Sequence, residues 1–187
     1  MPVLYISLAV VAAIVLWLVF VYNGLIRLRN RTQEAWSDID VQLKRRHDLI
    51  PNLVNSVRGY MEHERNLLEN ITRARSQALS AQEAGNKEEL GKIESQLGTM
   101  LGKLQIAVEA YPDLKANQNV SQLMDELSDT ENKIQAARRF YNTQVRDFNT
   151  KMEVFPTNLV AQSLHFTKFA FFEIAEASER ENIEVKL

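Results

Sequence analysis

Cysteine is absent from this chain, which excludes thiolate chemistry and leaves the redox compartment undefined. Glycine and proline are scarce, with six and four residues among 187. No run of alternating apolar and polar residues is long enough for a useful strand. Few helix breakers, together with abundant Leu, Ala, Glu, Gln, Lys and Arg, favour helices. The composition therefore predicts an all-α protein.

A strong excess of either charge is also missing. The formal net charge is −2, which argues against a nucleic-acid-binding surface. The first charged side chain is Arg27, and the twenty residues from Val3 to Tyr22 contain no charge, proline or glycine. Because a helix rises about 1.5 Å per residue, such a segment spans about 30 Å, the thickness of a bilayer's hydrocarbon core. The segment is predicted to be a transmembrane helix.

Two other interpretations of this segment fit less well. A cleaved signal peptide has a basic start, a shorter apolar core and small residues at its end, none of which is present. A buried core helix has a polar face, whereas this segment is apolar all round. Arginines follow the segment at once, at Arg27, Arg29 and Arg31. By the positive-inside rule we expect a single-pass membrane protein, with its N-terminus outside and its soluble domain in the cytoplasm.

Helical spacing of apolar residues continues after the membrane segment. Either one helix runs from the membrane into the body, or the chain hinges at Gly24. At Pro51, either Asp48 caps a new helix or a long helix kinks, and we prefer the kink because no loop-forming residues lie between. The apolar pattern then continues through Tyr60 and Leu67 to Gly85.

Further helices are expected in the second half of the chain. One begins at Asn86, which forms a capping-box pattern with Glu89, and it ends before Pro112. A helix of about 36 residues follows, with Asn119 as its expected cap, and a short helix covers 157–164. We predict a membrane anchor (1–23), an elongated antiparallel four-helix-type bundle (24–175) and a charged tail (176–187).

Motifs that would carry catalysis are missing. His63 lacks the second histidine that a zinc-protease helix needs, because position 67 is Leu67. No histidine has a glutamate three residues before it, as the carboxylate-bridged di-iron bundles require. No phosphate-binding glycine loop or serine nucleophile motif occurs. We therefore expect no enzyme activity, cofactor, metal or small-molecule substrate.

Some charges fall where core residues are expected. Glu64 and Glu131 lie on apolar stripes, and Arg138 and Arg139 follow two turns after Glu131. Either the stripes drift and these charges lie at the edge of the bundle, or they form a buried polar layer that fixes helix register.

Aromatic residues and asparagines near the C-terminus are candidates for an interaction surface. Asn142 and Asn149 each follow an aromatic residue on the core stripe, seven residues apart, and either flank the core or face a partner. Four phenylalanines then occur within seven residues, and they either close one end of the bundle or form an exposed patch. These are Phe166, Phe169, Phe171 and Phe172.

Several blocks in order resemble the LemA family of membrane-anchored bacterial proteins. They include Arg45-Arg46-His-Asp48-Leu-Ile-Pro51-Asn52, Gly59-Tyr60-Met-Glu-His63-Glu64, Tyr111-Pro112-Asp-Leu-Lys115 and Thr130-Glu131-Asn132, and they continue through Arg138-Arg139-Phe-Tyr141-Asn142 to Phe155-Pro156. Phe148 stands where that family more often has Tyr. The resemblance implies a four-helix-type soluble domain, an N-out topology in the bacterial inner membrane and no established catalytic activity. Relatives in magnetosome membranes suggest a role in organising membrane patches.

The expected function is a membrane-tethered helical scaffold or adaptor that assembles with itself or with partner membrane proteins. Its expected partners are the lipid bilayer and a second copy or another membrane protein. Ala9 and Ala13 form a weak small-residue contact pattern that is compatible with self-association. The alternative is a signalling or stress-response component that relays a conformational change through the bundle.

Overall fold

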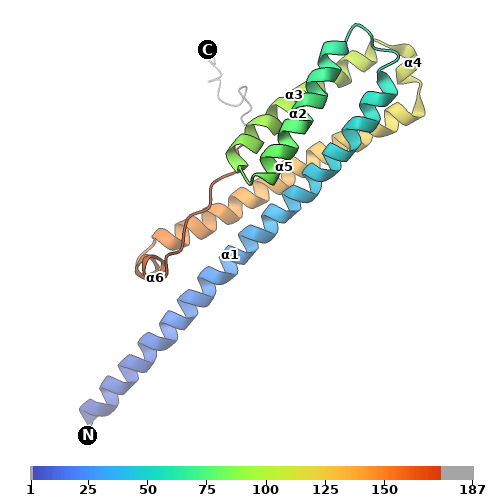
Figure 1. Cartoon of the computed structure of the whole chain (residues 1–187). Helices are drawn as coiled ribbons and strands as arrows, with labels where there is room; N and C mark the ends of the chain where they lie inside the picture. Colours follow the sequence, from blue (N-terminus) through green and yellow to red (C-terminus); the bar gives the residue numbers. More distant parts are fainter. Residues whose placement is uncertain (1, 174–187) are drawn as a thin grey trace, which may run out of the picture. The chain divides into compact units, whose positions relative to one another are not determined.

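The computed structural model describes residues 2–173, and the expected tail at 176–187 lies outside the described residues. The described part is all-helical and has no strand, as predicted. Its elements are α1 (Pro2–Val57), α2 (Arg65–Glu83), α3 (Lys87–Glu109), α4 (Pro112–Lys115), α5 (Gln118–Glu153) and α6 (Thr157–Ser163), as labelled in Figure 1.

Helix α1 is continuous over 56 residues, from Pro2 to Val57. It passes through Gly24 without a break. Of the two alternatives at Gly24, the structure therefore shows the continuous helix and not the hinge. Pro51 also lies inside α1. No new helix therefore begins near Asp48.

The first true break comes later than the sequence suggested. The apolar pattern through Tyr60 predicted a helix without interruption, but α1 ends at Val57 and α2 begins at Arg65. The amides of Tyr60 and Met61 close tight turns onto the carbonyl of Val57. Met61 is buried whereas Tyr60 is 53% exposed, which explains why the helical stripe was misleading here.

Helix α3 begins as predicted. Asn86 accepts a hydrogen bond from the amide of Glu89 at 3.1 Å and donates to the Glu89 carboxylate at 2.9 Å, which is a capping box with asparagine in the first position. At α5 the predicted cap is wrong by two residues. Asn117, not Asn119, accepts from the amides of Asn119 and Val120. The connection after Pro112 contains the single turn α4.

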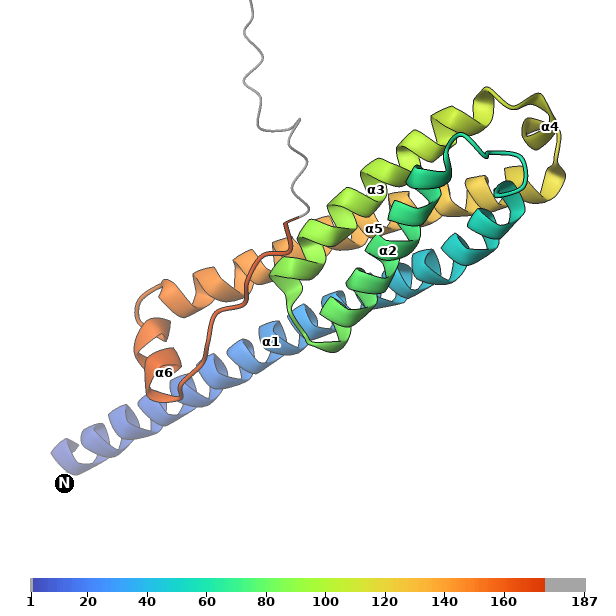
Figure 2. The ribbon, with the colours of Figure 1, turned by 45° about the horizontal axis from the view of Figure 1, so that its top comes forward.

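The chain divides into two compact units, which are described separately. The anchor unit comprises residues 1–39 and 137–171. Its core contains Val21 and Leu25 of α1, Phe148 of α5, and Val160 and Ala161 of α6. In Figures 1 and 2, α6 lies beside α1, and the extended segment after α6 runs back along α5. This unit carries the predicted transmembrane segment.

Among the described residues, the bundle unit comprises residues 40–136 and 172–173. Four long segments contribute to one core: the end of α1, all of α2 and α3, and the start of α5, with α4 closing one end. Representative core residues are Leu53, Ile71, Leu104, Leu114 and Val120. The residues follow helical spacing within each segment, so each helix presents one apolar stripe to the centre.

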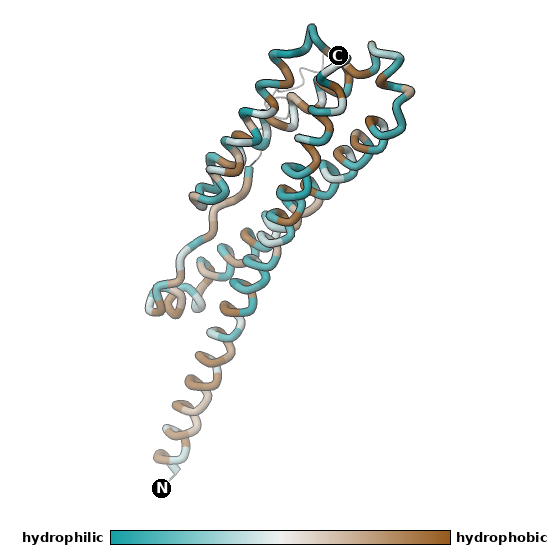
Figure 3. The backbone as a smooth tube through the Cα atoms, turned by 45° about the vertical axis from the view of Figure 1, so that its right-hand side comes forward, coloured by the Kyte–Doolittle hydropathy of each residue, from teal (hydrophilic) through white to brown (hydrophobic). Residues whose placement is uncertain are grey.

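The first turns of α1 stand apart in their chemistry. One helix of the described chain is long and apolar enough to cross a membrane, and none of its most apolar 18-residue window is buried. Figure 3 shows this part of the tube as almost continuously hydrophobic. Apolar side chains that remain uncovered over several helical turns are expected in a segment that lipid surrounds.

Candidate functional site

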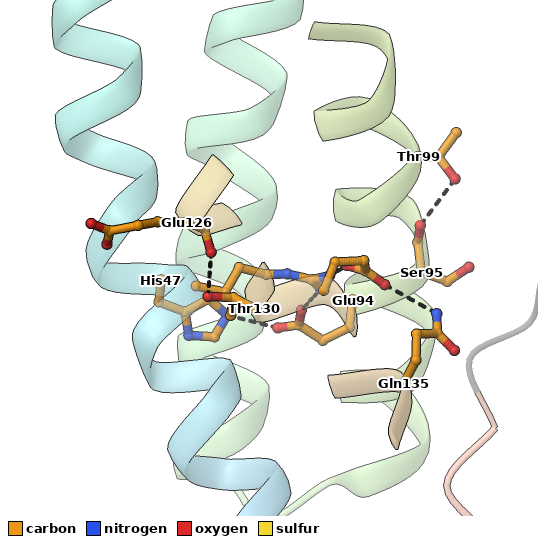
Figure 4. A network of polar contacts seen from close by, with 9 residues as sticks. His47, Glu94, Ser95, Thr99, Glu126, Thr130 and Gln135 are labelled. Atoms are coloured by element: carbon orange, nitrogen blue, oxygen red, sulfur yellow. Dashed lines mark hydrogen bonds and ion pairs between the residues drawn. The ribbon is translucent and has the colours of Figure 1, made fainter. Parts of the chain in front are cut away.

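A buried cluster of charged side chains lies in the bundle unit (Figure 4). Arg46 and His47 of α1 and Glu94 of α3 are each 1% exposed, and Figure 4 shows His47 and Glu94 facing each other. Nη1 of Arg46 donates to Oε2 of Glu94 at 2.7 Å, and Nε2 of His47 lies 2.6 Å from Oε1 of the same carboxylate. One glutamate on α3 therefore holds two consecutive residues of α1.

A third helix joins the same cluster. Glu131 of α5 forms an ion pair with the second guanidinium nitrogen of Arg46, and its carboxylate also accepts from the Gln135 side chain at 3.0 Å. Gly98 of α3 lies over this pair, since a Cβ at that position would be 3.9 Å from both side chains. Arg46 thus connects α1 to α3 and α5 through a single side chain.

Helix α2 is connected to the cluster through the backbone carbonyl of His47. Proline has no amide hydrogen, so Pro51 cannot donate to the carbonyl four residues before it, which is that of His47. Nε of Arg75 on α2 donates to this carbonyl instead, at 2.6 Å. The arginine supplies the hydrogen bond that Pro51 removes, and this allows α1 to continue through a proline.

The cluster has a defined proton arrangement. A carboxylate only accepts hydrogen bonds, so Nε2 of His47 carries the proton that faces Glu94. Nδ1 of His47 and Nε of Arg46 are buried and make no hydrogen bond.

The arrangement is suited to holding helices together. Its central carboxylate and imidazole are closed to solvent, and among the residues 2–173 no group of His, Asp and Glu is placed to hold a metal ion. Buried ion pairs often contribute little net stability but favour one arrangement of helices over others. The cluster joins four helices of one unit in a single register.

A small pocket adjoins the exposed side of the cluster. Its volume is about 150 Å³, and its lining includes Gly98 and Gly102 of α3, Met124 of α5 and the carboxylate of Glu131. The two glycines leave room between α3 and α5, because neither carries a side chain. The pocket is too small for a typical cofactor, which occupies several hundred cubic ångströms.

The predicted polar-layer residues occupy different environments. Glu131 belongs to the cluster described above. Glu64 is half-buried and accepts a hydrogen bond from the Tyr111 hydroxyl at 2.5 Å. That hydrogen bond, followed by burial and the carboxylate charge, raises the pKa of Tyr111. In the anchor unit, Arg138 is half-buried and Arg139 is exposed.

The predicted aromatic surface is mostly packed inside. Phe166 and Phe169 are half-buried against Phe148, with ring centroids 6.3 and 5.2 Å away. Phe171 is 49% exposed, whereas Phe172 is buried in the bundle unit.

Both predicted asparagines are half-buried in the anchor unit. Asn149 donates to the carbonyl of Phe169 at 2.9 Å and accepts from its amide at 3.1 Å, which fixes the extended segment after α6. Asn142 also has a polar interaction partner in the structure.

Sequence reasoning missed Arg46, His47 and Glu94 as site residues. A signal was available, because Glu94 follows Leu90 by four positions and precedes Leu97 by three, the same interruption of an apolar stripe that drew attention to Glu64 and Glu131. The neighbouring Ile93 also fits that stripe by spacing, but it is only partly buried. Spacing alone does not decide whether Ile93 or Glu94 is buried, because that depends on which face of the helix packs against the core.

An all-helical chain with one N-terminal helix apolar enough to cross a membrane belongs to the class of membrane-associated helical proteins. Residues 35–187 match the LemA family. Protein LemA of Metamycoplasma hominis is 36% identical over 170 residues, which cover 89% of this chain and 75% of that protein. The chain belongs to the LemA family.

More distant relatives are magnetosome proteins. Magnetosome protein MamQ 2 of Paramagnetospirillum magneticum is 23% identical over 93% of this chain and 72% of its own length. Magnetosome protein MamQ of Magnetospirillum gryphiswaldense is 22% identical over 94% of this chain and 73% of its own length.

Proposed function

We propose that this protein is a membrane-tethered scaffold, which assembles with copies of itself or with partner membrane proteins at the cytoplasmic face. The observation that carries the proposal is the pairing of two features in one chain. Residues 3–20 are uncovered and apolar, which suits a bilayer, and the body is held by a solvent-closed polar cluster with no open reaction site among the described residues. Such a body is suited to presenting surfaces to partners.

Exposed apolar side chains of the bundle unit supply contact points. Ile106 of α3 is 72% exposed and Val41 of α1 is 62% exposed. Single exposed apolar residues are common, but they serve as anchors when a partner covers them. The relatives named as magnetosome proteins are compatible with the proposal.

Crosslinking in native membranes tests this function. The full chain is expected to yield a ladder of its own multiples or a stoichiometric adduct with one other membrane protein. Ile106→Glu should weaken the adduct because it places a charge at an apolar contact. Ser76→Glu, at an exposed position of α2 in the same unit, is the matched control and should leave the adduct intact. Monomer alone at native expression level would contradict the proposal.

A further inference from the structure

The turn from α5 into α6 exposes apolar side chains in a stretch without charge. From Val154 to Phe166 the sequence contains no Asp, Glu, Lys or Arg. Within the α5–α6 corner, defined as residues 154–164, four apolar side chains are exposed to solvent. They are Val154 (43%), Phe155 (78%), Leu159 (55%) and Leu164 (49%). A soluble surface seldom leaves such a continuous stretch uncovered, so it marks a contact site.

The opposite side of this corner packs onto the end of the membrane segment. Val160 and Ala161 of α6 share one core with Val21 and Leu25 of α1. Immediately after α6, the ring of Phe166 packs edge-on against Tyr22, with centroids 6.4 Å apart. Figures 1 and 2 show α6 beside α1 at this level. The corner therefore lies where the apolar run of α1 stops.

Its depth follows from the length of that run. If residues 3–22 fill the hydrocarbon core of about 30 Å, Val21 lies at the boundary between acyl chains and headgroups. Any helix packed on Val21 lies at the same boundary. We infer that the α5–α6 corner is a second membrane contact of this chain, with Phe155 and Leu159 dipping into the bilayer interface; this inference rests on the membrane tethering proposed above.

The surrounding chemistry matches anionic lipid. Arg27, Arg29 and Arg31 are exposed on α1 beyond the membrane segment. Arg27 lies about 8 Å past Tyr22, at the outer edge of the headgroup region, and the other two follow within about the next 6 Å, where long side chains can reach back to phosphate groups. A groove of about 350 Å³ in this unit is lined by the rings of Tyr22, Phe166 and Phe169 together with Arg29. Aromatic rings with a cation beside them are typical of the headgroup region. If a second protein copy covered the α5–α6 corner, the corner would not have to lie beside the end of the membrane segment.

Fluorescence quenching in vesicles tests the contact. Because the chain has no cysteine, Phe155→Cys and Leu159→Cys each provide one labelling site for an environment-sensitive dye. The full chain is reconstituted into phosphatidylcholine–phosphatidylglycerol vesicles that carry a nitroxide near the acyl carbonyl. Phe140→Cys is the matched control, since Phe140 is 51% exposed on α5 and about 20 Å along that helix from the corner. We expect quenching by the nitroxide lipid to be severalfold stronger at positions 155 and 159 than at 140.

Two further readings separate the outcomes. With Trp36→Phe, the remaining Trp17 reports whether α1 itself is inserted. Quenching of Trp17 without quenching at 155 and 159, while crosslinked assemblies persist, would overturn the corner contact and leave the scaffold function standing. Absence of Trp17 quenching would overturn both. Protection of the corner dyes that disappears on dilution of the protein in lipid would assign the surface to a second copy and overturn the lipid contact.

Discussion

Arg75 on α2 donates a hydrogen bond to the backbone carbonyl of His47 on α1 at 2.6 Å, at the position that Pro51 leaves without its usual donor. The same His47 uses its ring to bind Glu94 of α3, and Glu94 binds Arg46. Proline would normally interrupt a helix. Here the turn of α1 that precedes Pro51 is the place where α2 and α3 bind to α1.

This arrangement predicts strong coupling between Arg75 and Pro51. Arg75→Ala should lower the free energy of unfolding by about 1–3 kcal/mol, because the carbonyl of a buried residue loses the donor that the arginine supplies. In the background of Pro51→Ala, the restored amide can satisfy His47, so the same arginine substitution should cost clearly less. A double-mutant cycle measured by urea unfolding in mild detergent gives the coupling energy. Equal costs in both backgrounds would show that Arg75 does not replace the missing amide.

Arg46 is predicted to be the most sensitive charged residue of the bundle unit. Arg46→Met leaves two glutamates without their cation, one of them closed to solvent, and should cost about 3–5 kcal/mol of unfolding free energy. Arg65→Ala removes one member of an exposed pair with Glu69 and should cost less than about 1 kcal/mol. Thermal unfolding followed by circular dichroism compares the two variants. Similar losses for both would mean that burial of the cluster has no energetic consequence.

Two glycines of α3 should respond in opposite directions to alanine. At Gly91 a Cβ would lie 2.7 Å from the carbonyl oxygen of Glu173, so the backbone there would have to move. Gly91→Ala should therefore lower stability by about 1–3 kcal/mol and speed amide exchange at 171–173. At Gly102 a Cβ meets nothing within 4 Å, and Gly102→Ala should stabilise by about 0.5–1 kcal/mol. Stabilisation by both substitutions would refute the close approach at Gly91.

Tyr141 should make stability depend on pH in the alkaline range. Its hydroxyl donates to the carbonyl of Ala170 at 3.0 Å, and burial raises the pKa of Tyr141 to about 12. The unfolded chain ionises this group near a pKa of about 10, so the unfolded state releases the proton first and is favoured as pH rises from 10 to 12. The native state should lose stability across that window, and below it the group should contribute no pH dependence.

Comparison with Tyr141→Phe isolates this effect from other alkaline titrations. The stability of the variant relative to the unmodified protein should stay constant up to about pH 9 and then rise, because only the unmodified protein can gain by ionising when unfolded. Phe140→Leu, at an exposed position of α5 and without any ionisable group, is the control and should show a constant difference. A constant difference for Tyr141→Phe as well would mean that this phenol ionises equally in both states.

Local signals in the sequence predicted much of the secondary structure. Asn86 with Glu89 located the start of α3, and the spacing of apolar residues predicted the 36-residue length of α5. These features depend on neighbours within one or two turns, so they can be read without a fold. The break after Val57 was missed because Gly59 carries too weak a signal against an apolar stripe that continues through Tyr60.

The charge-free run from Val3 to Tyr22 and the composition by themselves determined the class of this protein, because the bilayer's thickness and the cost of burying charge act on any sequence in the same way. Only the tertiary structure decided which side chains Arg46 and Glu131 contact, and that Arg75 supplies the hydrogen bond that Pro51 removes. Their contacts join residues as many as 85 positions apart, since Arg46 meets Glu131, and such contacts depend on which helix faces come together. Local periodicity places a charge on a stripe, whereas the packing of several helices determines what that charge meets.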